Sequence, residues 1–312
     1  MGIFTSFLSG AIHLGTTFVY GSVGETITEK SGHLNLGIPG IMCFGALGGC
    51  LGVSMVGATP VLTVIMGIIM SFLFAGLLGM LYSFFTVTLR ANQNVTGLTI
   101  TTFGVGATNF FITKINDASF AKASTQFTNL FTFHDKLGGF GEIFLSHGIL
   151  VYLAIVIAVL SSLFLNKTKK GLYLRAVGES PATADAAGIN VSRYKYVATF
   201  VGSGIAGLGG LFYIMDYLTG SWEYTIDAMG WLSIALVIFT VWKPNWAILG
   251  SYIFGAFYIL AQYVSVSFAM MRILKMTPYV VTIIVLIITS VRGKKENQPP
   301  ASLGLNYFRE ER

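Results

Sequence analysis

Apolar runs of about 20 residues recur along this chain, and they constrain its fold more than any other feature, because a helix of that length crosses the bilayer core. The run at 61–89 has almost no polar residue, whereas a helix of a soluble core keeps a polar stripe. Only 10% of the 312 residues are charged, against about a quarter in soluble domains. A β-barrel would show short alternating segments instead. The sequence therefore predicts an all-α, polytopic bundle of transmembrane helices.

The runs place about nine spans, within a range of about eight to ten. They lie at 3–23, 41–56, 59–89, 95–112, 148–165, 196–215, 228–242, 246–268 and 278–291. The polar, glycine-rich segment 24–40, which contains Pro39, has two interpretations. It is either an aqueous loop with Glu25, Glu29 and Lys30 on a solvated face, or a discontinuous helix at membrane depth.

Basic residues cluster in the loop 166–195, and the positive-inside rule puts that loop in the cytoplasm. The cluster consists of Lys167, Lys169, Lys170, Arg175, Arg193 and Lys195. The tail 292–312 also begins with cations and is predicted to be cytoplasmic, whereas the charge-balanced interval 114–147 belongs outside. The N-terminus is then outside if 24–40 connects two spans, and inside if that segment re-enters. The sequence leaves both topologies open.

A short helix with its own start and stop signals lies within the basic loop. Ser180 can accept a free backbone N–H of the first turn, and Pro181 follows where a missing N–H costs nothing. Mostly strong helix formers fill 182–187, and Gly188 suits the left-handed residue that ends a helix. About two turns, roughly 10 Å long, are too short to be stable alone in water. We therefore expect this helix to dock into another protein.

Small residues within the spans predict close helix packing. They include Gly202, Gly204, Gly207, Gly209 and Gly210 in one run, and Gly97, Thr101, Gly104 and Gly106 in another. His13 lies within the first span, where we interpret it as a packed, hydrogen-bonded residue rather than a proton relay.

The sequence has none of the motifs typical of an enzyme or an ATPase. It contains no G-x-x-x-x-G-K-[ST] phosphate loop, no G-x-S-x-G element and no metal-ligand spacing of His, Cys and carboxylates. We therefore predict no catalytic residue, no metal site and no cofactor bound by this chain. The net charge of +6 comes from the basic ends of the apolar runs and does not indicate nucleic-acid binding. Charged residues are scarce inside the predicted spans, which argues for an outside energy source.

The segment GLYLRAVGESPATADAAGINVSRYKY (171–196) resembles the cytoplasmic coupling segment of ABC importer permeases of the ribose and branched-chain amino-acid type. Within it, 184–188 is similar to the EAA-loop core of importer permeases. Further blocks resemble the nucleoside branch, whose permeases work with basic-membrane-protein-type lipoproteins. These blocks are TEKSGHLNLGIPG (28–40), LRANQNVTG (89–97), GWLSIALVIFTVWKP (230–244), TPYVVTIIVL (277–286) and PASLGLNY (300–307). Three positions depart from the branch: Lys30 replaces Arg, Pro39 replaces Glu, and Asn94 replaces an apolar residue.

The resemblance implies a single transmembrane permease domain over residues 1–312, in the inner (cytoplasmic) membrane of a bacterium. It also implies three protein partners: an ATPase that uses the ATP, a second related permease, and an extracytoplasmic substrate-binding lipoprotein. The residues that it implies in coupling to the ATPase are Glu179, Ser180, Pro181, Ala184, Asp185, Ala186, Ala187 and Gly188.

The nucleoside branch implies a neutral cargo, and side-chain amides suit it because they both donate and accept hydrogen bonds. We predict a substrate path beside four such side chains, and a contact of Glu223 with the lipoprotein outside. The four are Asn35, Gln93, Asn94 and Gln262. Three other functions stay open: an ABC permease for a simple sugar or branched-chain amino acid, an ion-coupled secondary transporter, and a passive channel.

Overall fold

Helices joined by turns and irregular segments make up this computed structural model, which describes residues 2–56, 59–115, 118–128, 137–264, 267–292 and 298–308. Within these ranges, seven helices are long and apolar enough to cross a membrane. They are α1 (Ile3–Glu29), α2 (Ile38–Val56), α3 with its π-helical end η1 (Pro60–Thr88), α4 (Gln93–Ile112), α7 (Ile149–Lys167), α10 with its π-helical end η3 (Val191–Tyr217) and α12 (Pro244–Tyr263). The predicted helical bundle is confirmed.

Two further helices coincide with the remaining predicted spans. α11 (Ile226–Phe239) is apolar but shorter, and α13 (Phe268–Arg292) has 25 residues. The π-helical ends are η1 (Phe84–Thr88), which follows α3 (Pro60–Ser83), and η3 (Tyr213–Tyr217), which follows α10 (Val191–Phe212). Of the predicted cytoplasmic tail, 293–297 and 309–312 lie outside the described residues.

Several boundaries differ from the sequence prediction. α1 continues past residue 23 to Glu29, and Pro39 does not break a helix because it lies in the first turn of α2. α13 begins ten residues early and passes through Pro278. The short helices α5 (Ala118–Ser124), α6 (Gly138–Phe144) and α8 (Lys169–Glu179) were not predicted, because none of them is a long apolar run.

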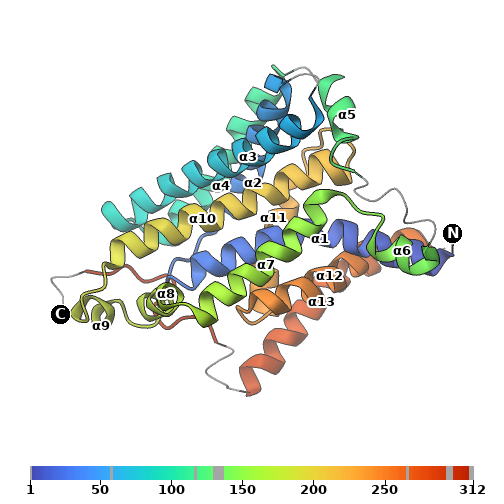
Figure 1. The fold of residues 1–312 in the computed structure, drawn as a ribbon. Coiled ribbons are helices and arrows are strands. Elements are labelled where there is room, and N and C mark those ends of the chain that lie inside the picture. The colour runs from blue at the N-terminus through green and yellow to red at the C-terminus, as the bar shows by residue number, and fades with distance from the viewer. Residues whose placement is uncertain are drawn as a thin grey trace.

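α10 forms the centre of the bundle, where it packs against α1, α2 and α3. In an apolar stretch of 18 residues within α10 and η3, 83% of the residues are buried, against 39% in the corresponding stretch of α3 and η1. α1 lies beside α10 and also contacts α11 and α12. Figure 1 shows α2, α3 and α4 grouped on one side of α10, with α12 and α13 on the other side, where α13 diverges from the bundle.

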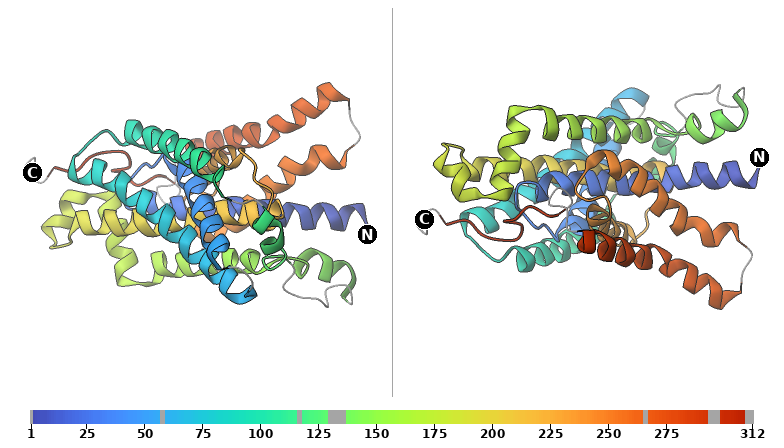
Figure 2. Two further views of the ribbon diagram at one scale, coloured as in Figure 1. Left: turned by 90° about the horizontal axis from the view of Figure 1, so that it is seen from above. Right: turned by 90° about the horizontal axis from the view of Figure 1, so that it is seen from below.

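The two ends of the bundle carry different parts of the chain. α8, α9 (Pro181–Ala186) and the C-terminus lie at one end, which we call the α9 end (Figures 1 and 2). The N-terminus lies at the opposite, N-terminal end. α1 therefore runs along the bundle to Glu29, and residues 30–37 connect it to α2. This arrangement and the predicted cytoplasmic position of the basic loop together predict an N-terminus on the outside.

Glycines bring the central helices almost backbone to backbone, as their clustering predicts. A Cβ atom added at Gly207 of α10 would lie 2.2 Å from the Cβ of Ala75 in α3. One added at Gly104 of α4 would lie 2.5 Å from the carbonyl oxygen of Gly40 in α2. Gly106 differs, because no described atom lies within 4 Å of an added Cβ, so it does not contribute to the packing there.

We expect Gly207→Ala to lower the melting temperature of the detergent-purified protein, because α3 and α10 must separate at a cost of about 1–3 kcal/mol. Gly106→Ala is the matched control on an open face, where alanine is favoured over glycine by roughly 0.5–1 kcal/mol. It should leave the melting temperature unchanged or raise it. Equal melting temperatures of the two variants would contradict close packing at Gly207.

Candidate functional site

The short helix expected in the basic loop is present as α9, with the start and stop that the sequence predicts. Ser180 is its N-cap and accepts the backbone N–H of Thr183 at 3.4 Å, and a proline occupies the first helical position. At the other end, Gly188 has a φ of +81°, a conformation that favours glycine. The N–H of Gly188 donates to the carbonyl oxygen of Asp185, and that of Ile189 donates to the preceding turn. The residues predicted to couple therefore lie on and beside one well-defined turn.

One side of α9 packs against the chain and the other side is open. Ala184 is buried against Val177 of α8 and Val191 of α10. Ala186 and Ala187 are exposed. Only residues 187–190 separate α9 from α10, so a displacement of the open face can reach the central helix directly.

The C-terminal residues 298–308, which we call the C-terminal strap, cross the α9 end of the bundle. The N–H of Ser302 donates to the carbonyl oxygen of Gly178 in α8 at 3.0 Å. The hydroxyl of Tyr307 donates to Oδ2 of Asp185 in α9 at 2.8 Å. The strap thus fixes both helices of the basic loop from one side.

The strap also holds the link between α3 and α4. The side-chain amide of Asn306 donates to the carbonyl oxygens of Arg90 and Ala91 at 2.8 and 3.0 Å. Gln93 donates to a strap carbonyl at 3.2 Å and accepts the N–H of Leu34 at 2.8 Å. Gln93 therefore ties the strap to the segment between α1 and α2.

That segment, residues 30–37, joins α1 to α2 inside the bundle, and we call it the buried turn. The backbone N–H of Asn35 donates to Glu25 at 3.1 Å, and its side-chain oxygen accepts the N–H of Gly37 at 2.9 Å. His33 is hydrogen-bonded to Thr199 of α10 at 2.9 Å. The buried turn is neither an aqueous loop nor a discontinuous helix. It is irregular backbone whose N–H groups at Leu34, Asn35 and Gly37 bond to side chains inside the protein.

Glu25 and Glu29 are buried, which excludes the interpretation that placed them on a solvated face. They lie four residues apart on α1, so they share a side of that helix, and their surfaces are 0% and 2% exposed. Glu29 accepts the indole N–H of Trp242. Trp242 and Val241 form a turn after α11 with φ values of 54° and 56°, which is strained for residues other than glycine.

Carboxylates inside the bundle are therefore not as scarce as the sequence prediction held. Glu25, Glu29 and Asp216 are all buried among the described residues. The prediction took the two glutamates as part of a loop and Asp216 as part of an external link. Because that premise is wrong, an outside energy source does not follow from the charges of the spans.

Blocks that are far apart in the sequence meet at the α9 end. Gln93, from 89–97, bonds to both 28–40 and 300–307. Trp242, from 230–244, bonds to Glu29. The structure thus assembles four of the quoted blocks into one polar cluster beside α8 and α9.

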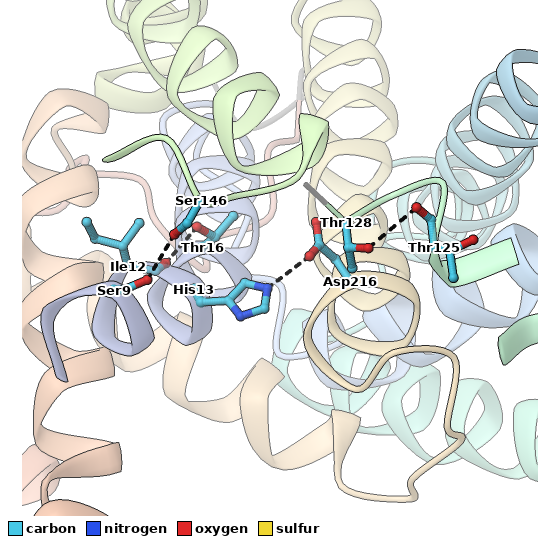
Figure 3. A network of polar contacts seen from close by, with 8 residues as sticks. All are labelled: Ser9, Ile12, His13, Thr16, Thr125, Thr128, Ser146 and Asp216. Carbon is cyan, nitrogen blue, oxygen red and sulfur yellow. Dashed lines mark hydrogen bonds and ion pairs between the residues drawn. The ribbon is translucent and has the colours of Figure 1, made fainter. Parts of the chain in front are cut away.

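A second polar cluster lies toward the N-terminal end (Figure 3). His13 of α1 points to Asp216 of η3, and its Nε2 lies 2.9 Å from Oδ1 of that residue, so the predicted hydrogen bonding of His13 is confirmed. The second oxygen, Oδ2, has no partner among the described residues. Burial lowers the pKa of His147, whose ring lies beside that of His13, to about 4, and the charge of His13 adds to this effect. His147 is therefore neutral at pH 7.

The residues predicted for a substrate path do not all come together. Asn35 and Gln93 both hold the buried turn. Asn94 is exposed next to Gln93, and Gln262 is exposed near the end of α12, at the N-terminal end of the bundle. Glu223 is exposed between η3 and α11.

Sequence reasoning did not single out Trp242 or Asn306, and it misplaced Glu29. The four-residue spacing of Glu25 and Glu29 directly after an apolar run was a signal that α1 continues. Trp242 and Asn306 lie inside blocks of resemblance, which is the one sequence signal that marks them. In the described ranges, no group of three His, Cys, Asp or Glu residues could hold a metal ion.

Comparison with known proteins adds the family. Residues 7–290 match the model of the branched-chain amino acid transport system permease component. The chain is similar to the nucleoside ABC transporter permease protein NupC of Lactococcus lactis, with 32% identity over 307 residues and 94% of each chain covered. It is also similar to the guanosine ABC transporter permease protein NupQ of Bacillus subtilis, with 29% identity over 311 residues, 93% of this chain and 92% of the relative.

A third relative is TsgC13 of Haloferax volcanii, named as a candidate glucose ABC transporter permease protein. It is 29% identical over 258 residues, which cover 82% of this chain and 76% of the relative. No solved structure matches the chain.

The helices define a multi-pass membrane protein. The match over 7–290 shows that the chain belongs to the family of permease components of branched-chain amino acid transport systems. A permease component is the membrane part of a transporter rather than an enzyme in its own right, and the ABC permease family implies a separate ATPase as its partner.

Proposed function

We propose that this chain is the membrane-spanning permease subunit of an ATP-driven importer of nucleosides. The likeness to NupC over 94% of both chains carries the proposal, and the likeness to NupQ supports it. TsgC13 favours a second candidate cargo, a simple sugar, but it covers less of both chains. The chain itself contributes no phosphate loop, so ATP is used by the partner.

The complete importer contains, in this proposal, the ATPase, a second related permease and an extracytoplasmic substrate-binding lipoprotein in the cytoplasmic membrane of a bacterium. Glu223 is exposed on a link between helices and is available to the lipoprotein. Buried carboxylates such as Glu25 and Asp216 are groups that ion-coupled carriers use. The family nevertheless works with an ATPase, so we place ATP before an ion gradient as the energy source.

We propose further that the open face of α9 sits in a groove of the ATPase and passes its movement to α10. Three observations support this role: the capped helix, its exposed alanines and the short connection to the central helix. The buried side of α9 keeps the helix folded while the open side engages the partner.

Uptake into proteoliposomes that contain all four kinds of subunit tests the proposed cargo. We expect ATP-dependent uptake of at least one labelled nucleoside from a panel of guanosine, adenosine and uridine, and no uptake of glucose or leucine. A variant ATPase that cannot hydrolyse ATP is the control. Uptake of glucose alone would favour the sugar candidate, and uptake driven by an ion gradient without ATP would contradict the energy source.

We predict that Asn35→Ala raises the apparent KM for nucleoside uptake about tenfold, the effect of one lost hydrogen bond of about 1.4 kcal/mol. The Nδ2 group of Asn35 is a buried donor without a partner among the described residues, and we propose that a nucleoside on its path satisfies this donor. Asn35→Ser separates this role from the turn, because a hydroxyl can still accept the N–H of Gly37. Recovery of normal uptake in the serine variant would remove Asn35 from the substrate path.

A further inference from the structure

A pocket of about 460 Å³ opens at the α9 end, between η1, α9, the start of α10 and the C-terminal strap. This volume lies within the range of small-ligand sites in proteins. The coupling role proposed above uses the open face of α9 and assigns nothing to this pocket.

Lys195 of α10 forms part of the pocket wall and is 3% exposed. In the described part of the chain, no carboxylate lies within ion-pair distance of its ammonium group and no hydrogen bond reaches it. A largely buried ammonium group that faces a pocket without a protein partner is costly, so this position favours an anion.

Two further features of the pocket attract negative charge. Arg90 also lines the pocket, where its guanidinium group lies 4.9 Å from the ring of Phe308 and forms no ion pair with a described carboxylate. Ser192, in the first turn of α10, lines the pocket as well. α10 has 22 residues, and the N-terminus of a helix offers free N–H groups and a positive dipole end.

One carboxylate opposes these groups. Asp185 also lines the pocket. Its carboxylate accepts a hydrogen bond from the hydroxyl of Tyr307, and this bond partly neutralises the negative charge that Asp185 presents to the pocket. Two cations and a helix N-terminus therefore face a single, already hydrogen-bonded carboxylate. The pocket keeps a net positive character.

We propose that this pocket binds a phosphate group, carried either by free phosphate or by the headgroup of an anionic phospholipid. The guanidinium of Arg90 can bind two phosphate oxygens at once, and Lys195 supplies a point charge beside the same group. Asn190 already accepts the N–H of Arg193 at 2.9 Å, so the N–H groups of Val191 and Ser192 complete the contacts. The inference is independent of the imported cargo, because the pocket lies beside the coupling helix.

Two probes test the proposal on the detergent-purified full-length chain. Equilibrium binding of ³²P-labelled inorganic phosphate to the delipidated chain measures the free anion, and native mass spectrometry after mild extraction measures retained phosphatidylglycerol. We expect at least one probe to bind. Phosphate binding without retained lipid identifies the free anion, and retained lipid without phosphate binding identifies the headgroup.

Three variants decide whether the pocket is responsible. Lys195→Gln should weaken binding of the bound probe about tenfold, the usual effect of removing one charge-assisted hydrogen bond. Arg193→Gln is the matched control, because it removes the same charge two residues away at an exposed position that does not line the pocket. Ser192→Asp places a negative charge at the pocket while favouring the helix N-terminus, so it should abolish binding and stay folded.

The melting temperature gives a second readout. The bound probe should raise it in the wild type and in Arg193→Gln, and should leave it unchanged in Lys195→Gln. If Lys195→Gln does not fold, the comparison of probe binding between Ser192→Asp and the wild type decides the proposal. Binding of neither probe, or equal binding by Lys195→Gln, Ser192→Asp and the wild type, would overturn the proposal.

Discussion

Ala186→Trp is expected to reduce uptake by at least about tenfold while the ATPase still hydrolyses ATP, because a loss of about 1.4 kcal/mol in docking corresponds to that factor. Ala186 is exposed on the open face of α9, so we expect the indole to point away from the described part of this chain and toward the docking partner. The variant should therefore insert and purify as the wild type does. Uptake and ATP hydrolysis are measured on the same reconstituted complex.

Ala121→Trp is the matched control for this experiment. Ala121 is exposed on α5, away from the basic loop, so the same increase in side-chain volume should leave uptake unchanged. Wild-type uptake by Ala186→Trp would show that α9 does not transmit movement from the ATPase. Equal losses in both variants would point to a general effect of an added surface indole.

Asn306→Ala should lower uptake about tenfold. The effect is expected although Asn306 lies in the tail, beyond the last helix. The substitution removes three hydrogen bonds of the strap, to Arg90, Ala91 and Gln93, each worth about 1 kcal/mol. The link between α3 and α4 then separates from the strap, and Gln93 keeps fewer contacts with which to hold the buried turn. Uptake kinetics and limited proteolysis of the C-terminus measure the effect.

Gln298→Ala provides the comparison within the strap. Gln298 is exposed at its start, so the loss of this amide should change neither uptake nor protease resistance. If Asn306→Ala transports normally while its C-terminus is cleaved faster, the strap is a passive tail. The proposed connection between the tail and the buried turn would then be wrong.

Local patterns predicted the features that depend on neighbouring residues. The cap at Ser180 and the glycine at Gly188 each act within a few residues, so the sequence was enough to place α9. The apolar runs predicted the helices for the same reason. The predicted end of a helix was wrong where polar residues continue it, as in α1, which ends at Glu29. The prediction had taken polar residues to be exposed to water, whereas Glu29 is buried.

The polar cluster at the α9 end could not be predicted from spacing alone. Glu29 and Trp242 are 213 residues apart, as are Gln93 and Asn306. Resemblance marked the blocks that contain them, and it gave no indication that these blocks touch. The roles proposed for Asn35 and for the coupling residues stay predictions, and the uptake measurements on their variants test them.

The sequence by itself determined that this chain is a bundle of membrane-crossing helices with a capped helix on its most basic loop, because hydropathy and capping are properties of short stretches. Only the tertiary structure decided that Glu25 and Glu29 are buried, that His13 is hydrogen-bonded to Asp216, and that the C-terminal strap bonds to the helices of the α9 end. Those contacts depend on which helices pack together, and packing is set by the shape and close approach of surfaces that are remote from one another along the chain.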